Sequence, residues 1–387
     1  MLSEKTNHII MQMFDKVEFG SLELIHPCGK KNKFIGPKSG PNAVMRLNNT
    51  NVIQNMILKG DVALAADYQD GKWDTDSIAN LIEFGALNAN ALKQAIFGKK
   101  SQQILSKIAY LFQANTKSGS KRNIHAHYDL GNDFYKIWLD QSMTYSSAIF
   151  KSDTDSLLNA QNNKYDRILQ QLPKAPQHIL EIGCGWGGFA ERCVTTTDHN
   201  LTGITISQEQ FDYARTRLQK YNTNIQLTDY RDVEGTFDTI VSIEMFEAVG
   251  EKYWPVYFDK IKSLLGQNGT VVLQTITIGD EYFANYRKSG DAIRSYIFPG
   301  GMLPSPTVFQ LYAEQSGLKV IHKYFFGQDY AKTLEHWLVS FDNNLNAIKQ
   351  LGFDEKFIRM WRFYLGFCIG AFKAKRTNVM QVVLTHA

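Results

Sequence analysis

The segment HILEIGCGWGGFA at residues 178–190 constrains the fold of this chain more than any other. An apolar run typical of a buried strand leads into a glycine-rich turn, and the turn leads into a helical pattern. Gly183, Gly185 and Gly188 can take backbone angles closed to other residues, and they let the chain approach a ligand with no Cβ in the way. The segment therefore predicts an α/β core that binds a nucleoside cofactor.

The kind of cofactor follows from what is absent. A dinucleotide site with this glycine spacing carries an acid about 20 residues further on for the ribose, where this chain has Gly203. Glu181 precedes the first glycine and suits a cofactor with an amino group, because a carboxylate would repel the phosphates of a dinucleotide. The turn therefore favours S-adenosylmethionine over NAD, and the alternative is that Glu181 only caps the next helix.

Strand-like and helix-like segments alternate from residue 178 to residue 278. Such alternation predicts an α/β fold with a doubly wound parallel sheet and helices on both faces. The last residues, GAFKAKRTNVMQVVLTHA, have the pattern of strand, turn and strand. We therefore expect a Rossmann-like sheet of the class I methyltransferase type with a C-terminal hairpin.

The chain of 387 residues exceeds one average domain, so two domains are expected. Residues 1–115 are predicted to form a small α+β domain with strands FGSLELI, NAVMRL and ALAADY and a helix over DTDSIANLIEFGAL. The polar stretch TKSGSKRN at 116–123 is the predicted linker. Residues 124–387 are predicted to form the catalytic domain.

A basic region separates Glu83 from Asp129, because no acidic residue falls between them. Apolar residues at 104, 105, 108, 111 and 112 recur there at helical spacing. One hypothesis is a helix that lies on an anionic membrane surface; the other is a core-packed helix with a solvated edge. The cations are Lys93, Lys99, Lys100, Lys107, Lys117, Lys121 and Arg122.

Composition and cysteine spacing bound the location. Charged residues are 21% and apolar residues 44%, and the net charge of +4 is too small to indicate nucleic acid. No run of eighteen apolar residues occurs, and the first residues lack the order of a signal peptide. A cytoplasmic protein without a disulfide framework or metal site is expected, because the cysteines are scattered at Cys28, Cys184, Cys193 and Cys368.

Four further segments resemble one family in order and separation: IHAHYDLGND at 124–133, MTYSSA at 143–148, FEAVG at 246–250 and YIFPGGMLPS at 296–305. The chain resembles the cyclopropane-fatty-acyl-phospholipid synthases, and DYQDGKWD at 67–74 extends the similarity to nearly its whole length. The resemblance implies a homodimeric enzyme at the inner face of the membrane. It implies transfer of the methyl group of S-adenosylmethionine to a cis double bond of a phospholipid acyl chain, which gives a cyclopropane ring.

The resemblance also assigns site residues. It implies that the cofactor is bound by Tyr145, Ser146, Glu181, Gly183, Gly185, Gly187, Thr205, Ser207, Gln210, Asp229 and Tyr230. For each hydroxyl residue a helix cap is the alternative, which Ser207 suits because Glu209 and Gln210 follow it. In this family a bound bicarbonate is the base that removes a methyl proton, and the residues at its pocket are Ser147, Glu247, Gln274 and Tyr330.

This chain departs from the family pattern at that pocket. Ser147 stands at a cysteine position, Gln274 at a histidine position, and Ala248 where a histidine is common. Serine and amide groups can donate to an anion, but they do not titrate, which puts pH response and product in question. Glu247 beside an anion is expected to have a raised pKa. Cys368 matches a cysteine proposed as a nucleophile, but its apolar surroundings favour a buried thiol.

Three alternative functions stay open. The first is an enzyme with the same fold and cofactor that leaves a methyl-branched or methylene acyl chain, which Ser147, Gln274 and Ala248 favour. The second is a small-amine N-methyltransferase, although an amine substrate does not require the N-terminal domain. The third is a non-catalytic lipid-binding protein, against which the retained glycines and Glu247 argue. Acyl chain length, double-bond position and headgroup are not fixed by the sequence.

Overall fold

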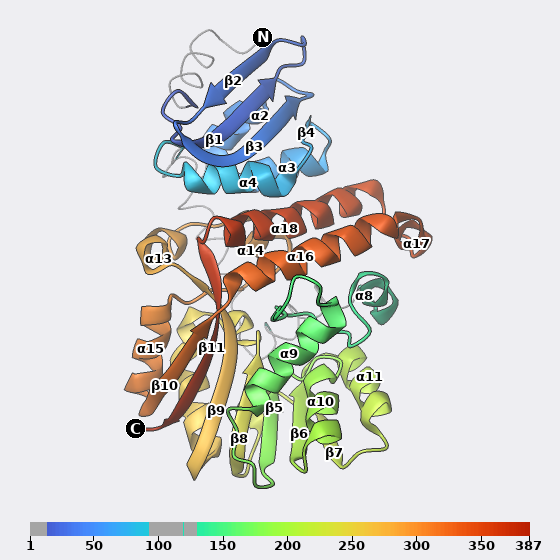
Figure 1. Cartoon of the computed structure of the whole chain (residues 1–387), viewed down its shortest axis with the longest axis vertical. Coiled ribbons are helices and arrows are strands. Elements are labelled where there is room, and N and C mark those ends of the chain that lie inside the picture. Colours follow the sequence, from blue (N-terminus) through green and yellow to red (C-terminus); the bar gives the residue numbers. More distant parts are fainter. Residues whose placement is uncertain (1–13, 93–118, 120–129) are drawn as a thin grey trace. The chain divides into compact units, whose positions relative to one another are not determined.

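The computed structural model describes residues 14–92, 119 and 130–387 (Figure 1). These residues form two compact units, and each unit is built from separate stretches of chain. Unit 1 contains the described residues of 1–112, 284–299 and 334–376. Unit 2 contains those of 113–283, 300–333 and 377–387.

Unit 2 is organised around a seven-stranded sheet in the order β10-β11-β9-β8-β5-β6-β7. The strands are β5 (His178–Ile182), β6 (Asn200–Thr205), β7 (Thr223–Leu227), β8 (Phe237–Ile243), β9 (Leu265–Ile278), β10 (Leu318–Phe325) and β11 (Thr377–His386). Strands β5 to β9 are mutually parallel, and the chain runs from β5 outward to β7 before it returns to β8 on the other side of β5. The order reverses between β5 and β8, and ligands of such sheets bind at the carboxyl ends of the strands there.

Helices cover both faces of this sheet, as expected. On one face Tyr165 and Phe189 pack against Val241. Successive side chains of a strand point to opposite faces, and the neighbouring Ser242 meets Tyr257 of α12 (Trp254–Leu264) on the other face. The helices of unit 2 are α8 (Asn132–Trp138), α9 (Leu157–Leu169), α10 (Gly188–Thr196), α11 (Gln208–Leu218), η1 (Tyr230–Asp232), η2 (Phe246–Ala248), η3 (Glu251–Tyr253), α12 (Trp254–Leu264) and α15 (Pro306–Gln315); α10 and α11 pack on β6 and β7 (Figure 1).

The predicted C-terminal hairpin is wrong, although its last strand is present. β11 pairs antiparallel with both β9 and β10. Three helices separate β10 from β11 in the chain: α16 (Gly327–Asn343), α17 (Leu345–Gln350) and α18 (Glu355–Lys373). The residues predicted as the first strand of the hairpin form the C-terminal end of α18 instead. A short apolar run does not distinguish a strand from the end of a buried helix.

Unit 1 contains a four-stranded sheet in the order β2-β1-β3-β4. The strands are β1 (Phe19–Ile25), β2 (Lys31–Ile35), β3 (Lys38–Leu47) and β4 (Trp73–Asp74), and the N-terminal helices are α2 (Val52–Lys59), α3 (Asp61–Gln69) and α4 (Ile78–Leu87). The predicted strand ALAADY is wrong because it lies in α3. Alanine favours a helix, and the helix is buried on more than one face, which hides the usual periodicity.

Helix α18 packs closely on α4 within unit 1. A Cβ atom at Gly366 would lie 2.7 Å from Cβ of Ile78, and one at Gly370 would lie 2.6 Å from the carbonyl oxygen of Ala79. The guanidinium of Arg359 donates to the carbonyl oxygens of Tyr68 and Trp73 at 2.6 and 2.9 Å. The DYQDGKWD segment therefore has a structural role in joining α3, β4 and α18.

The compact units do not follow the contiguous division expected from the sequence. The segments 284–299 and 334–376 belong to unit 1 by their contacts, and α16 begins in unit 2 and ends in unit 1. Two short helices, α13 (Asp280–Tyr286) and α14 (Ala292–Tyr296), lie near the first of these segments. Nearly all of the predicted linker and basic helix lies outside the described residues, so the domain boundary stays a prediction.

Candidate active site

The glycine turn lies where the sequence places it, at the carboxyl end of β5. Gly183, Gly185 and Gly187 have φ of 82°, 53° and 82°, values that side-chain-bearing residues rarely adopt. The N–H groups of Gly183 and Cys184 donate to the carbonyl oxygen of Ile204 at 3.0 and 2.9 Å. The turn is therefore held by the backbone of β6 and leads directly into the N-terminus of α10.

Glu181 is a buried carboxylate two residues before the turn. It is 2% exposed, and its Oε2 atom has no hydrogen-bond partner among the described residues. Burial raises its pKa well above the ordinary value, and the Lys164 cation opposes this rise. A buried acceptor without a donor costs about 1–3 kcal/mol, which a ligand with amino or hydroxyl groups can recover. The residues present therefore fit S-adenosylmethionine.

The segment 143–148 contributes Tyr145 and Ser146. The Nζ of Lys164 donates to Ser146 Oγ at 2.6 Å, and Gln161 Nε2 donates to the carbonyl oxygen of Ser146 at 2.9 Å. Tyr145 packs against Tyr135 with ring centroids 5.6 Å apart. Helix α9 therefore fixes the main chain beside the predicted cofactor pair.

Lys164 is a residue that the sequence interpretation missed. It is fully buried, which lowers its pKa to about 7, while Glu244, Asp140 and Glu181 act in the opposite direction. A signal was present, because Lys164 shares the buried face of α9 with Gln161 and Ile168. A lysine on such a face rarely stays buried unless it is paired.

The two other cofactor segments are ordered by their own side chains. Thr205 Oγ1 donates to Gln210 Oε1 at 2.8 Å, and Ser207 caps α11 by accepting from the N–H of Gln210. The capping alternative for Ser207 is therefore confirmed, and contact with a cofactor stays a prediction. Asp229 caps η1 and accepts two hydrogen bonds from Arg231, at 2.8 and 2.6 Å. Burial raises the pKa of Tyr230 to about 12.

The predicted anion-holding residues do come together, but around a carboxylate that the sequence interpretation did not include. Glu244 Oε1 accepts from the backbone N–H of Ser147 at 2.8 Å and from Gln274 Nε2 at 2.7 Å. The hydroxyl of Tyr330 also hydrogen bonds to the Glu244 side chain. The donors to the Glu244 carboxylate therefore come from Ser147, Gln274 and Tyr330. Glu244 itself follows β8 directly.

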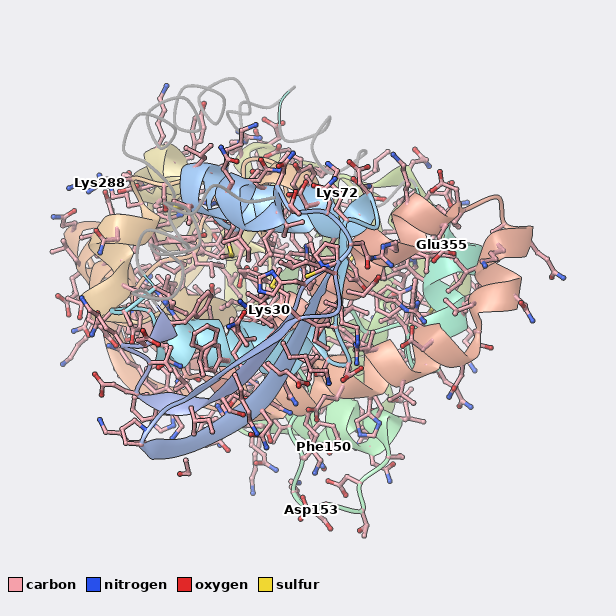
Figure 2. The ribbon with its side chains drawn as sticks, turned by 90° about the horizontal axis from the view of Figure 1, so that it is seen from above. Lys30, Lys72, Phe150, Asp153, Lys288 and Glu355 are labelled. Atoms are coloured by element: carbon pink, nitrogen blue, oxygen red, sulfur yellow. The ribbon has the colours of Figure 1, made fainter. Side chains whose placement is uncertain are left out.

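Helix α16 holds this pocket from one side. It carries Tyr330, and Thr333 Oγ1 accepts from the N–H of Ala148 at 3.0 Å. Lys332 donates to Asp153 at 2.8 Å, and its Nζ lies 4.7 Å from the centroid of the Phe150 ring. Phe150 and Asp153 lie on the outlying loop before α9 (Figure 2). The loop that follows Ser147 is thus tied to the helix that carries Tyr330.

Glu247 has a different set of contacts. Its Oε1 accepts from the N–H of Ile276 and from Thr275 Oγ1, and its Oε2 has no partner among the described residues. Burial and then the neighbouring charge of Glu244 raise its pKa to about 8. The expected raised pKa is confirmed. At neutral pH the Glu247 carboxyl is mainly protonated.

These contacts test the fit of bicarbonate. Gln274 and Tyr330, two of the predicted donors, already serve the Glu244 carboxylate, as does the backbone N–H of Ser147. The Ser147 hydroxyl donates instead to the carbonyl oxygen of Ala148 at 3.1 Å. Glu247 is a second acid beside Glu244. A further anion would lie beside the Glu244 carboxylate, which is unfavourable at short range, and among the predicted residues the protonated carboxyl of Glu247 is the donor left for it. The residues as arranged therefore do not fit bicarbonate.

Cys368 belongs to a different unit from the other candidates. It lies on α18 in unit 1, whereas the other predicted catalytic residues belong to unit 2. Burial raises the pKa of its thiol, and Asp291 raises it further. A thiol in such surroundings is a poor nucleophile.

Within 14–92, 119 and 130–387, no group of three or more His, Cys, Asp or Glu residues is arranged to hold a metal ion. Over the same ranges, no helix is both long and apolar enough to cross a membrane.

The glycine turn, the acid before it and the parallel sheet define an S-adenosylmethionine-dependent methyltransferase of class I fold. Residues 115–382 match the family model described as mycolic acid cyclopropane synthetase, and the chain belongs to this family. It is 34% identical to the cyclopropane-fatty-acyl-phospholipid synthase of Escherichia coli K12 over 353 residues, which are 89% of this chain and 88% of the relative. It is 33% identical to the tuberculostearic acid methyltransferase UfaA1 of Mycobacterium tuberculosis, covering 84% of this chain and 79% of the relative.

Solved structures agree with this assignment. The mycolic acid cyclopropane synthase CmaA1, in complex with SAH and CTAB, superimposes with a TM-score of 0.64 at 30% identity. The superposition covers 68% of this chain and 97% of CmaA1. The predicted fold class is confirmed, and so is S-adenosylmethionine as the cofactor.

Proposed function

We propose that this protein transfers the methyl group of S-adenosylmethionine to a cis double bond of a phospholipid acyl chain and forms a cyclopropane ring. One observation carries the proposal: in unit 2 the cofactor turn follows β5, and a pair of acidic side chains, Glu244 and Glu247, follows the adjacent parallel strand β8. Addition of an electrophilic methyl group to an alkene needs a proton acceptor and no enzyme nucleophile. The described cysteines of unit 2, Cys184 and Cys193, have raised pKa values because they are buried.

The residues of the site are proposed to have different roles. Glu181 and the turn at Gly183–Gly187 would hold S-adenosylmethionine, which supplies an electrophilic methyl group when bound. Tyr145 and Ser146 would contact the cofactor, and side chains of α9 hold Ser146 in place. The family resemblance implies bicarbonate as the base, but the residues as arranged do not fit it, so the proton acceptor is proposed to belong to the chain.

A second candidate is an acyl-chain methyltransferase that leaves a methylene or methyl-branched product. The relatives named for a cyclopropane synthase and for tuberculostearic acid methylation are almost equally similar to this chain. The replacement of titratable residues by Ser147 and Gln274 favours this candidate over a close copy of the synthase. A saturated methyl branch would also need a reductant, because ring closure and methylene formation involve no net reduction.

The membrane surface is the proposed partner, and the protein is proposed to be a cytoplasmic homodimer that docks on the inner leaflet. The basic residues between Glu83 and Asp129 support this partner. Neutralising Lys99, Lys100, Lys107 and Lys117 together should weaken sedimentation with anionic vesicles, and more at low salt than at high salt, since screening acts over about 10 Å at 0.1 M. Equal sedimentation of mutant and wild type would remove the support.

Mass spectrometry and NMR of lipid products test the reaction. Purified protein, S-adenosylmethionine and vesicles of a monounsaturated phospholipid should give acyl chains heavier by one CH₂ group, and vesicles of a saturated phospholipid should give none. Cyclopropane and methylene products have the same mass, so NMR must separate ring protons from vinyl protons. Methylation of a soluble amine with no lipid product would refute the proposal.

A further inference from the structure

We infer that the carboxylate of Glu244 takes the place of bicarbonate and is the base that accepts a proton from the transferred methyl group. This inference rests on the proposed function and names the catalytic group that the sequence interpretation lacked. Residues predicted to bind bicarbonate contact the Glu244 carboxylate instead.

The contacts of Glu244 are those of a bound anion. A backbone N–H from Ser147, an amide N–H from Gln274 and the phenolic O–H of Tyr330 all meet this one carboxylate. The three donors come from the 143–148 segment, from β9 and from α16, so the site is assembled from distant parts of unit 2. Gln381 Nε2 donates to Gln274 Oε1 at 3.0 Å, which directs the amide N–H of Gln274 toward the carboxylate.

The backbone at Glu244 supports a functional role. Its φ is 51°, in the left-handed region that favours glycine, and Met143 and Lys375 are the other non-glycine residues with positive φ in the described part of the chain. Such a conformation persists where the surroundings hold it and is concentrated at functional sites. A glycine would meet the backbone requirement here without cost, so the carboxylate is present for a reason other than the turn.

The titratable groups that face Glu244 are Glu247, Lys164 and Tyr330, and the last two favour its charged form. Glu247 has a pKa of about 8 and retains its proton at neutral pH, while the buried amine of Lys164 stabilises a nearby anion. Withdrawal from water raises the pKa of Glu244 itself. A carboxylate with a raised pKa is a stronger base, which suits removal of a carbon-bound proton.

The proposed step balances without a further reactant. The carbon–sulfur bond of the sulfonium breaks, its methyl carbon bonds to one alkene carbon, and the other alkene carbon becomes cationic. A proton then passes from the new methyl group to Glu244, and the electron pair of that C–H bond closes the ring. If a hydride first moves from the methylated carbon to the cation, the same proton loss gives an exocyclic methylene. Glu244 then releases the proton to solvent.

Three variants test the inference in buffers purged of carbon dioxide. Wild-type turnover should not change when bicarbonate is removed. Glu244→Gln keeps the size of the side chain and one acceptor oxygen for Ser147 and Gln274, and should lower turnover by a hundredfold or more, about the contribution of a positioned base. The matched control Glu234→Gln changes an exposed carboxylate in a loop and should leave turnover unchanged.

Glu244→Gly supplies the decisive comparison. It removes the carboxylate, suits the positive φ and leaves the donors of Ser147, Gln274 and Tyr330 available. Its turnover should fall as in Glu244→Gln and recover at least tenfold on addition of bicarbonate or formate. NMR of isotope-labelled bicarbonate should show binding to Glu244→Gly and none to the wild type, a readout that does not depend on turnover.

The outcomes separate this inference from the proposed function. Lipid products from a wild type that requires bicarbonate, or full turnover by Glu244→Gln, would overturn the base assignment and leave the lipid reaction intact. Bicarbonate binding to the wild type at the same affinity as to Glu244→Gly would also overturn it. No lipid product from the wild type under any condition would instead end the proposed function, and the inference with it.

Discussion

The cofactor half and the proton-accepting half of the site are built differently, although both belong to unit 2. The turn at Gly183–Gly187 is formed by neighbouring residues of one strand and one helix, and backbone hydrogen bonds to Ile204 hold it. The pocket around Glu244 is formed by side chains from separate segments, with Ser147 lying 97 residues away in the chain. Backbone geometry therefore specifies the first half, and a network of charges and amides specifies the second.

This difference explains why similarity to the family predicts the cofactor half of the site better than the proton-accepting half. A glycine turn tolerates little change, because each positive φ excludes most residues. A charge network can change its members as long as the sum of charges and donors is preserved, as when a carboxylate of the chain replaces a bound anion. Tests of the two halves should therefore fail in different ways.

The largest effect should come from Lys164→Met, which removes the cation shared by both halves. Removing one partner of a buried ionic group typically costs about 3–5 kcal/mol of unfolding free energy, and here Glu181 and Glu244 would lose their counter-charge. Chemical denaturation measures the loss, with exposed Lys174→Met as the control. The double variant Lys164→Met/Glu244→Gln should recover part of it; strictly additive losses would show that the two residues are not coupled.

The second effect should be confined to the cofactor half. A Cβ at Gly183 would lie 2.9 Å from Cγ of Met245, whereas one at Gly185 would meet nothing within 4 Å. Gly183→Ala should weaken S-adenosylmethionine binding about thirtyfold, from roughly 2 kcal/mol of strain and contact, and Gly185→Ala should weaken it less unless the bound cofactor fills that space.

Calorimetric titration measures both affinities. Gly235→Ala is the matched control, because Gly235 has φ of 98° and open surroundings away from the turn. It tests whether a strained backbone by itself is enough to weaken S-adenosylmethionine binding. Equal losses for Gly235→Ala and Gly183→Ala would contradict the role of close packing in the turn.

The same division, between features formed by neighbouring residues and features formed by remote segments, separates what the sequence could predict from what it could not. The parallel sheet, the glycine turn and the Ser207 cap depend on residues close in sequence, so periodicity and spacing found them. Glu244 directly follows β8 with nothing local to mark it, since its partners come from remote segments. The contribution of α18 to unit 1 was missed for the same reason: it depends on contact with α4, nearly three hundred residues away in the chain.

A third prediction uses pH to test the charge network. The pKa of Glu247 is raised from 4.5 to about 8, so between these values the folded protein binds a proton that the unfolded chain releases. Its contribution to stability is full below pH 4.5 and is lost as pH rises through about 8. Glu247→Gln should make the unfolding free energy less dependent on pH in this window, by about 1–2 kcal/mol.

Thermal or chemical unfolding at several pH values measures this difference. Asp61 in unit 1 also has a pKa raised to about 8 by burial, but it is present in both proteins, so the comparison isolates Glu247. Glutamine can still accept from Ile276 and Thr275 through its Oε1. Parallel pH profiles for the two proteins would show that Glu247 is ionised in the folded state at neutral pH.

The smallest effect should come from Gln381, a positioning residue of the proton-accepting half. Its amide fixes the orientation of Gln274 through one buried hydrogen bond, and a bond of this kind contributes about 0.5–1.5 kcal/mol. Gln381→Met should therefore lower kcat by roughly twofold to tenfold, because Gln274 can then turn its carbonyl oxygen toward Glu244. S-adenosylmethionine affinity should not change, since this hydrogen bond joins Gln381 to Gln274, which is not a predicted cofactor-binding residue. A raised apparent pKa in the pH–rate profile should accompany the lower kcat, because Glu244 would lose a donor that stabilises its charged form. A loss of cofactor affinity without a change in the pH profile would mean that the two halves of the site are not separately built.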